Sequence, residues 1–290
     1  MLPRLADELV EAAASPADNL PYCALLLARV AYPRLDPAPS LRELERMGAM
    51  ARDHLEIGLG GRPRRRMRLR IVTEFVFGQL GFTGNHEQYD DPRNSLLNDV
   101  LTRRTGIPIT LATVFIDIAR RAGLAVEGVN FPGHFLVRCL PDEHEPEERE
   151  PLLVDPFHAG AVLTTQECTR LLRTQLGAEA LLEPGMLRTA TKRDTLVRML
   201  LNLKRAYVRL RSFSQAHAVS ELLVALDPSA LAELRDRGLL ASQIRKDASA
   251  LRDLQVWLAH APDANEQDRE SRQQIWEHVK EIRRRMAGMN

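Results

Sequence analysis

Two residues of this sequence have the chemistry of an acid–base pair, His134 and Asp155. An imidazole held by a carboxylate is the usual means of fixing the ring for proton transfer. Two interpretations of His134 stay open. It is either a structural residue whose Nδ1 donates a hydrogen bond to Asp155, or a general base or ligand contact beside Asn98 and Thr110.

Further polar residues extend this candidate site. Thr110 offers a hydroxyl, and Gly133 leaves room for the close approach of a backbone or a ligand. Asparagine and serine side chains that could bind a ligand, or equally cap helices, are Asn94, Ser95 and Asn98. Asp155 precedes a proline, so its carboxylate could instead cap a turn that ends a strand.

The sequence predicts neither a metal site nor a cofactor. His86, Asp91 and His158 could join His134, but their spacing follows no pattern of metal ligands. The cysteines are odd in number and far apart, which argues against a disulfide framework or a zinc ribbon. They are Cys23, Cys139 and Cys168.

A central helix must position the hydroxyl of Thr110. Residues 109–121 are apolar on nearly every side, which indicates a buried helix. Pro108 suits its first position and Gly123 its C-terminal cap. A shorter helix is predicted over residues 96–101, with Asn94 or Ser95 as its N-cap.

Three strands must position the histidine and the aspartate. They are predicted over residues 125–130, 134–140 and 152–155. Because successive side chains of a strand face opposite ways, Cys139 should point away from the face of His134.

Both ends of the chain are predicted to be helical. Ser40 and Glu43 have the spacing of a capping box for a helix that ends near Leu59. In the C-terminal part, Pro228 and Pro262 lie 34 residues apart, which is the period of tetratricopeptide repeats. A capping helix is expected over residues 266–286.

A dense basic run occupies residues 62–70. Its arginines could contact phosphate or nucleic acid, or could form a solvated helix face that pairs with an acidic loop at 142–150. We favour the solvated face, because no aromatic side chains alternate with the arginines. The arginines are Arg62, Arg64, Arg65, Arg66, Arg68 and Arg70.

Bulk composition sets wider limits. The chain has 290 residues, 44% of them hydrophobic and 27% charged, with a net charge of +1. Such a length favours two domains, and such a balance is typical of a globular protein. No apolar run approaches the roughly 20 residues of a membrane span. We expect a cytoplasmic protein with no membrane association and no nucleic-acid partner.

Four short motifs together resemble the SirB family of bacterial proteins. They lie at residues 94–98 (NSLLN), 106–109 (GIPI), 132–136 (PGHFL) and 155–157 (DPF). The resemblance implies an α+β, transglutaminase-like (papain-related) core with N-terminal helices and a small antiparallel sheet. An all-α, tetratricopeptide-like domain would follow. We expect the first domain over residues 1–185 and the second over residues 186–290.

The same resemblance implies a cysteine nucleophile in the first turn of the central helix, where a helix dipole and a histidine lower the thiol pKa. The corresponding residues here are Pro108, Ile109 and Thr110, and none is a cysteine. We therefore expect a non-catalytic module that binds a protein or small-molecule partner. The alternative is a hydrolase or acyltransferase that uses His134 and Asp155 with water or a hydroxyl nucleophile.

Overall fold

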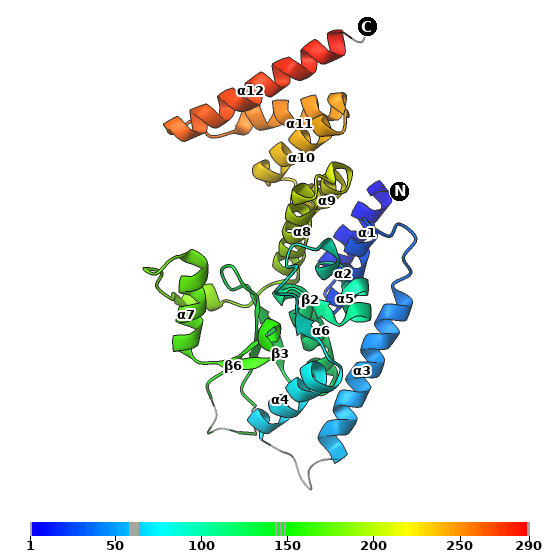
Figure 1. Cartoon of the computed structure of the whole chain (residues 1–290), viewed down its shortest axis with the longest axis vertical. Coiled ribbons are helices and arrows are strands. Elements are labelled where there is room, and N and C mark those ends of the chain that lie inside the picture. Colours follow the sequence, from blue (N-terminus) through cyan, green and yellow to red (C-terminus); the bar gives the residue numbers. More distant parts are fainter. Residues whose placement is uncertain (1, 58–63, 143, 146, 148, 289–290) are drawn as a thin grey trace. The chain divides into compact units, whose positions relative to one another are not determined.

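The structure, a computed structural model, describes residues 2–57, 64–142, 144, 145, 147 and 149–288 (Figure 1). Contacts divide the chain into two compact units. One unit lies between Ser15 and Met199, and the other combines helix α1 (Leu2–Ala14) with the residues from Leu200 on. The domain boundary expected after residue 185 stays a prediction. Among the described residues, no helix combines the length and apolar character of a membrane span.

In the unit between Ser15 and Met199, helices both precede and follow the strands along the chain. The α-helices are α2 (Leu20–Ala28), α3 (Ala38–Ile57), α4 (Arg65–Thr73), α5 (Leu97–Arg103), α6 (Pro108–Arg121) and α7 (Thr165–Leu176). Shorter helical segments are the π-helix η1 (Glu74–Gln79) and the 3-10 turns η2 (Pro92–Asn94), η3 (Pro156–His158) and η4 (Pro184–Leu187).

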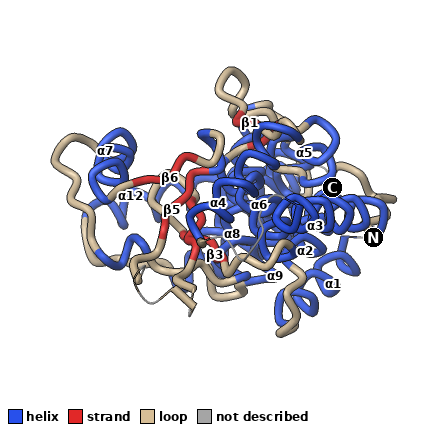
Figure 2. The backbone as a smooth tube through the Cα atoms, turned by 90° about the horizontal axis from the view of Figure 1, so that it is seen from below, coloured by secondary structure: helices blue, strands red, loops and turns tan. Residues whose placement is uncertain are grey.

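The strands form a small antiparallel sheet in the order β3-β4-β5-β6, which lies between α7 and α6 in Figure 2. The strands are β3 (Val126–Val129), β4 (Leu136–Cys139), β5 (Leu152–Asp155) and β6 (Ala161–Leu163). The expected strands correspond to β3, β4 and β5, and β6 was missed because it is short and largely exposed. A separate parallel pair joins β1 (Thr83–Gly84) to β2 (Thr105–Gly106).

Helix α6 is the predicted central helix. Pro108 opens it and Gly123, with φ +83°, follows its end, as the sequence predicts. It packs against β3, β4 and α3, and nearly all of its residues up to Ala119 are buried. An all-round apolar helix is stable only when it is covered in this way.

Helix α7 covers the opposite face of the sheet (Figure 1). Its Cys168 and Leu172 pack on Val129, Phe131 and Leu136. The loop between β3 and β4 is therefore fixed by apolar contacts on the same side as α7.

The other unit is entirely helical in its described residues. Besides α1 it contains the end of α8 (Lys192–Arg209) and the helices α9 (Phe213–Leu226), α10 (Leu231–Gln243), α11 (Asp247–His260) and α12 (Glu266–Ala287). Pro228 and Pro262 follow α9 and α11, as the repeat period predicts. The last helix buries Ile275, Val279 and Ile282 against α11. Helix α1 packs on α9.

The basic run pairs with the acidic loop. The backbone N–H of Arg65 donates to Glu145, its guanidinium donates to the carbonyl of Glu150, and Arg68 forms an ion pair with Asp142 at 3.0 Å. Three expected members, Arg62, Glu143 and Glu148, lie outside the described residues. Arg65 is only 2% exposed and is therefore a packing residue, not part of a solvated face. Arg66 and Arg70 are exposed, as the solvated face predicts.

Two capping predictions were wrong. Helix α3 begins at Ala38, whose N–H donates to the Asp36 carboxylate, so Ser40 and Glu43 form no capping box at its start. Helix α5 begins after Leu96 without a side-chain cap, so neither Asn94 nor Ser95 is its N-cap. Both errors arise because capping patterns are short and recur inside helices and turns.

Candidate functional site

His134 lies in the turn that connects β3 to β4, and not within the strand predicted over residues 134–140, because β4 begins only at Leu136. Its N–H donates to the carbonyl of Phe131 at 3.1 Å, and Gly133 before it has φ +67°. The side chains of Phe131 and Phe135 are both buried, so the turn is anchored on either side of the histidine. His134 is itself only 5% exposed.

Asp155 lies at the end of β5. Its Oδ1 accepts hydrogen bonds from the backbone N–H groups of Phe157 at 3.0 Å and His158 at 3.4 Å, which caps η3. The turn that the sequence suggested for this carboxylate is therefore present. The same oxygen lies 2.8 Å from Nε2 of His134. The structure thus brings the predicted pair together in a buried contact.

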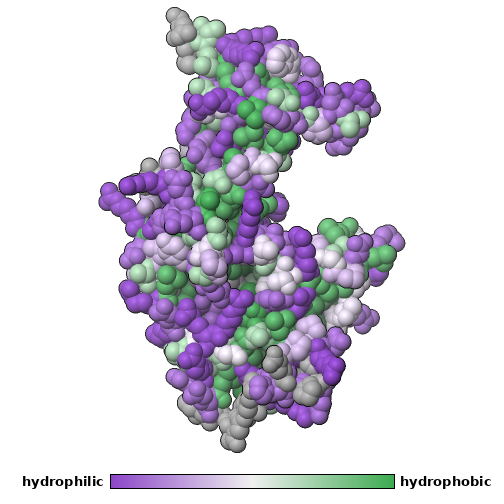
Figure 3. Space-filling model, turned by 180° about the vertical axis from the view of Figure 1, so that it is seen from behind, coloured by the Kyte–Doolittle hydropathy of each residue, from purple (hydrophilic) through white to green (hydrophobic). Residues whose placement is uncertain are grey.

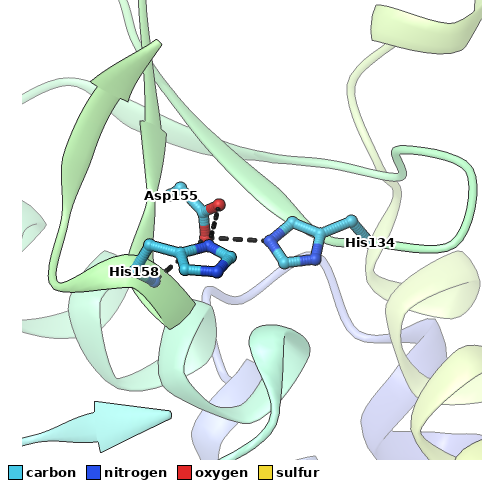
Figure 4. A group of neighbouring side chains, drawn as sticks. All are labelled: His134, Asp155 and His158. Atoms are coloured by element: carbon cyan, nitrogen blue, oxygen red, sulfur yellow. Dashed lines mark hydrogen bonds and ion pairs between the residues drawn. The ribbon is translucent and has the colours of Figure 1, made fainter. Parts of the chain in front are cut away.

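A second imidazole shares this carboxylate (Figure 4). Nδ1 of His158 lies 2.7 Å from Oδ2 of Asp155, and the His134 and His158 rings stack with centroids 5.9 Å apart. Burial raises the pKa of the Asp155 carboxyl, but hydrogen bonds and charge from His134, then His158, outweigh this and hold that pKa below its ordinary value. A contact of His158 with this carboxylate was not predicted from the sequence. The signal was its position three residues after Asp155, which a 3-10 turn brings back to the carboxylate.

The ring nitrogens of His134 have different roles. Nε2, not the expected Nδ1, contacts Asp155. Nδ1 has no hydrogen-bond partner among the described residues and points away from the carboxylate in Figure 4. With the Nε2 proton donated to Asp155, Nδ1 of a neutral ring carries a lone pair that can accept a proton.

Thr110 uses its hydroxyl to close the first turn of α6. The oxygen donates to the carbonyl of Asn94 at 2.7 Å, lies 3.1 Å from the carbonyl of Ile107, and accepts from the N–H of Ile107 at 3.1 Å. One hydroxyl has a single proton and two lone pairs, so these contacts occupy it. Thr110 is also fully buried.

The remaining candidates lie in two places. The amide of Asn94 donates to the carbonyls of Gln88 and Tyr89, and its Oδ1 accepts from Asn85, so it holds a loop. Ser95 is buried directly after η2, and Asn98 lies in α5 with a buried Oδ1 that has no described partner. Of these residues, Asn94 contacts the start of α6, through its carbonyl and the Thr110 hydroxyl. No hydrogen bond between described residues joins any of them to His134.

The space over Gly133 is filled. A Cβ atom built there would lie 2.7 Å from both Cγ and Oε1 of Gln175 on α7. The expected room for a ligand is therefore occupied by a side chain of the same unit.

All the cysteines are free, buried thiols. Burial raises the pKa of Cys139 and of Cys168 to about 11 each, and it also raises the pKa of Cys23. Cys139 lines a separate pocket of about 390 Å³ with Arg65 and Arg68. A nucleophilic thiol needs a lowered pKa, so these surroundings oppose thiolate formation.

Among the residues that the structure describes, one group of side chains could hold a metal ion. The ligand atoms of His134, Asp155 and His158 all lie within 4.8 Å of one another. Asp91 is engaged elsewhere, since its carboxylate caps η2 and pairs with Arg93 at 2.7 Å. His86 lies at the edge of the group, with its ring centroid 5.5 Å from that of His158.

Comparisons with known proteins agree with this architecture. A family model described as the transglutaminase-like superfamily matches residues 39–201, and a tetratricopeptide repeat model matches residues 203–277. A UPF0162 protein of Xylella fastidiosa is 36% identical over 249 residues, covering 84% of this chain and 85% of that protein. Protein SirB1 of Salmonella typhimurium is 27% identical over 248 residues, covering 85% and 88%. F-box only protein 21 of Homo sapiens is 39% identical over 99 residues, covering 33% of this chain but 16% of that protein.

Proposed function

Since this chain belongs to the SirB family, with a transglutaminase-like domain followed by tetratricopeptide repeats, we propose that it is a protein-binding module without cysteine-dependent acyl transfer. The transglutaminase-like domain keeps a histidine and an aspartate in contact, and the repeat unit supplies the binding surface. A cytoplasmic location is part of the proposal, supported by cysteines that are all free.

One observation carries the proposal. The first turn of α6 contains Pro108, Ile109 and Thr110, so it offers no thiol, and the Thr110 hydroxyl is held by Asn94 and Ile107. An acyl-transfer mechanism needs a nucleophile that a nearby base can deprotonate. A hydroxyl fixed in a helix cap lacks this freedom.

The repeat unit has a surface suited to a protein partner. Exposed hydrophobic residues appear among hydrophilic ones in Figure 3, and Trp276 of α12 is 40% exposed. A pocket of about 420 Å³ beside Trp276 is lined by Leu258, Arg269 and Arg272 among others. Aromatic and arginine side chains are the residue types enriched where protein partners bind. Asp263 also lines the pocket, so two arginines stand against one carboxylate there. The pocket therefore suits a segment that carries an apolar side chain near a carboxylate.

A second candidate function is hydrolysis by an activated water. Nδ1 of His134, which has no hydrogen-bond partner in the described part of the chain, favours it, since Nε2 is anchored on Asp155. This arrangement leaves one ring nitrogen available as a general base.

Activity assays separate the two functions. Peptidase, amidase and transglutaminase substrates would be tested with the wild type and with His134→Ala. We expect no turnover with either protein. Turnover by the wild type that His134→Ala abolishes would overturn the proposal in favour of the hydrolase.

A binding experiment tests the surface directly. Wild-type protein would be used as bait, beside Trp276→Glu and the control Val162→Glu, which alters an exposed hydrophobic residue of β6. We expect a partner that wild type and Val162→Glu retain and Trp276→Glu loses. Retention of the same partner by all three proteins would reject α12 as the binding surface.

A further inference from the structure

The Asp155 carboxylate lies close to two imidazole nitrogens, so three potential metal ligands are neighbours. Nε2 of His134 and Nδ1 of His158 lie 2.8 and 2.7 Å from the two oxygens of Asp155, and all three groups fall within 4.8 Å (Figure 4). We propose that His134, Asp155 and His158 bind a divalent first-row transition-metal ion such as Zn²⁺. This site goes beyond the proposed protein-binding function and does not depend on it.

The spacing suits a metal after the side chains adjust. Ligands at about 2.0–2.1 Å from a tetrahedral Zn²⁺ lie roughly 3.3 Å from one another. The two histidine–carboxylate contacts would therefore open by about half an ångström. The ligand atoms of the group, which lie within 4.8 Å of one another, would close by up to about 1.5 Å at the widest pair. Each neutral imidazole would then carry its proton on the other nitrogen, which is Nδ1 in His134 and Nε2 in His158.

The donor set selects the class of ion. Two imidazole nitrogens and one carboxylate oxygen suit Zn²⁺ and neighbouring transition metals, whereas Mg²⁺ and Ca²⁺ prefer oxygen ligands alone. His134 and Asp155 are 5% and 2% exposed, but the His158 side chain is 50% exposed. The ion would enter from the side of His158 and keep water in its remaining positions.

The backbone holds the ligands in place. Asp155 accepts from two N–H groups of η3, so its carboxylate cannot rotate freely. Ala159 and Gly160 complete the turn at φ +54° and +72°. A Cβ atom at Gly160 would meet Phe77 of η1 at 2.7 Å, which shows how tightly the turn is packed. Supporting contacts of this kind orient ligands in protein metal sites.

Equilibrium Zn²⁺ binding tests the site. Full-length protein stripped with a chelator would be titrated with Zn²⁺ in competition with a chromophoric chelator. We expect one ion per chain for wild type and an affinity at least about tenfold lower for His158→Ala. That variant alters an exposed side chain, so its fold should persist, which circular dichroism would check. Asp155→Asn should lose affinity as well.

A matched control excludes adventitious surface binding. His144 is exposed and lies 3.1 Å from Asp142, so it forms an imidazole–carboxylate pair without a second histidine. His144→Ala should bind Zn²⁺ as wild type does, and His86→Ala should lose less affinity than His158→Ala. Absence of stoichiometric binding by wild type, or equal binding by wild type and His158→Ala, would overturn the proposal.

Discussion

Asp155 is the residue on which the candidate site depends. Its carboxylate accepts hydrogen bonds from the backbone of η3 and contacts the rings of His134 and His158. A buried carboxylate without partners would be costly, and these contacts keep it charged. The geometry therefore has a structural role whether or not the histidines bind a ligand.

Gly133 offers a test of how the histidine turn is fixed. We expect Gly133→Ala to destabilise the protein by about 2 kcal/mol, because φ of +67° disfavours a side chain and the new methyl group would meet Gln175. Urea unfolding would measure the change. Gly185→Ala is the control, since no atom of another described residue lies within 4 Å of its Cβ position. Equal stability of the two variants would contradict this account.

At the scale of elements, polar contacts between segments position the start of α6 and the helices around it. The Thr110 hydroxyl ties α6 to the segment after η2, through the carbonyl of Asn94. Glu43 ties α3 to the end of α5, where Arg104 adopts φ +58°. Hydrogen bonds of this kind fix the register of packed helices, whereas apolar packing alone tolerates small shifts.

Glu43 makes stability depend on pH in a defined range. Hydrogen bonds from Arg46, then Arg104, lower the Glu43 pKa from 4.5 to about 2 despite partial burial. The unfolded carboxylate takes up a proton at a higher pH than the folded one. The stabilisation is therefore complete above pH 4.5 and is lost as pH falls towards 2.

The difference between wild type and Glu43→Gln measures this contribution. We expect about 1 kcal/mol at neutral pH, because the pair is partly exposed, and a decline below pH 4.5. Urea unfolding at a series of pH values would follow it. Glu45→Gln removes a charge from an exposed position of α3 and is the control. A difference that grows on acidification would refute the assignment.

At the scale of the whole molecule, the chain forms two units with separate internal packing. Two repeats fall short of the three that usually make a stable array. In the unit that contains the repeats, α1 packs on α9 and α12 packs on α11. These two helices cover faces that two repeats alone would leave open. The first helix of the sequence thus belongs to the same unit as the last.

Paired glycine substitutions test whether the units are stabilised separately. A Cβ at Gly238 in α10 would lie 2.9 Å from Leu254, and one at Gly128 in β3 would lie 2.9 Å from Phe135. Overpacking by Gly238→Val should cost about 1–3 kcal/mol and raise hydrogen exchange in α10 and α11. Gly128→Val should raise exchange in the sheet and α6 instead. An increase spread equally over both units in either variant would contradict the division.

The sequence alone determined the main helices and strands and the lack of a cysteine nucleophile at the start of the central helix. Residues 109–121 are apolar on nearly every side, with Pro108 and Gly123 at the ends, and this pattern predicted α6. The sequence also shows directly that the first turn of α6 contains no cysteine. The repeat period predicted the helical C-terminal part. These features are local, because periodicity and caps act within a few residues of one another.

Only the tertiary structure decided how the side chains meet. It determined that Nε2 of His134 faces Asp155, that His158 shares the carboxylate, and that Thr110 is held by Asn94. It also placed Gln175 over Gly133. These contacts join segments that are distant in the sequence or that turn back on themselves. The contacts therefore depend on strand pairing and helix packing, which no local sequence pattern encodes.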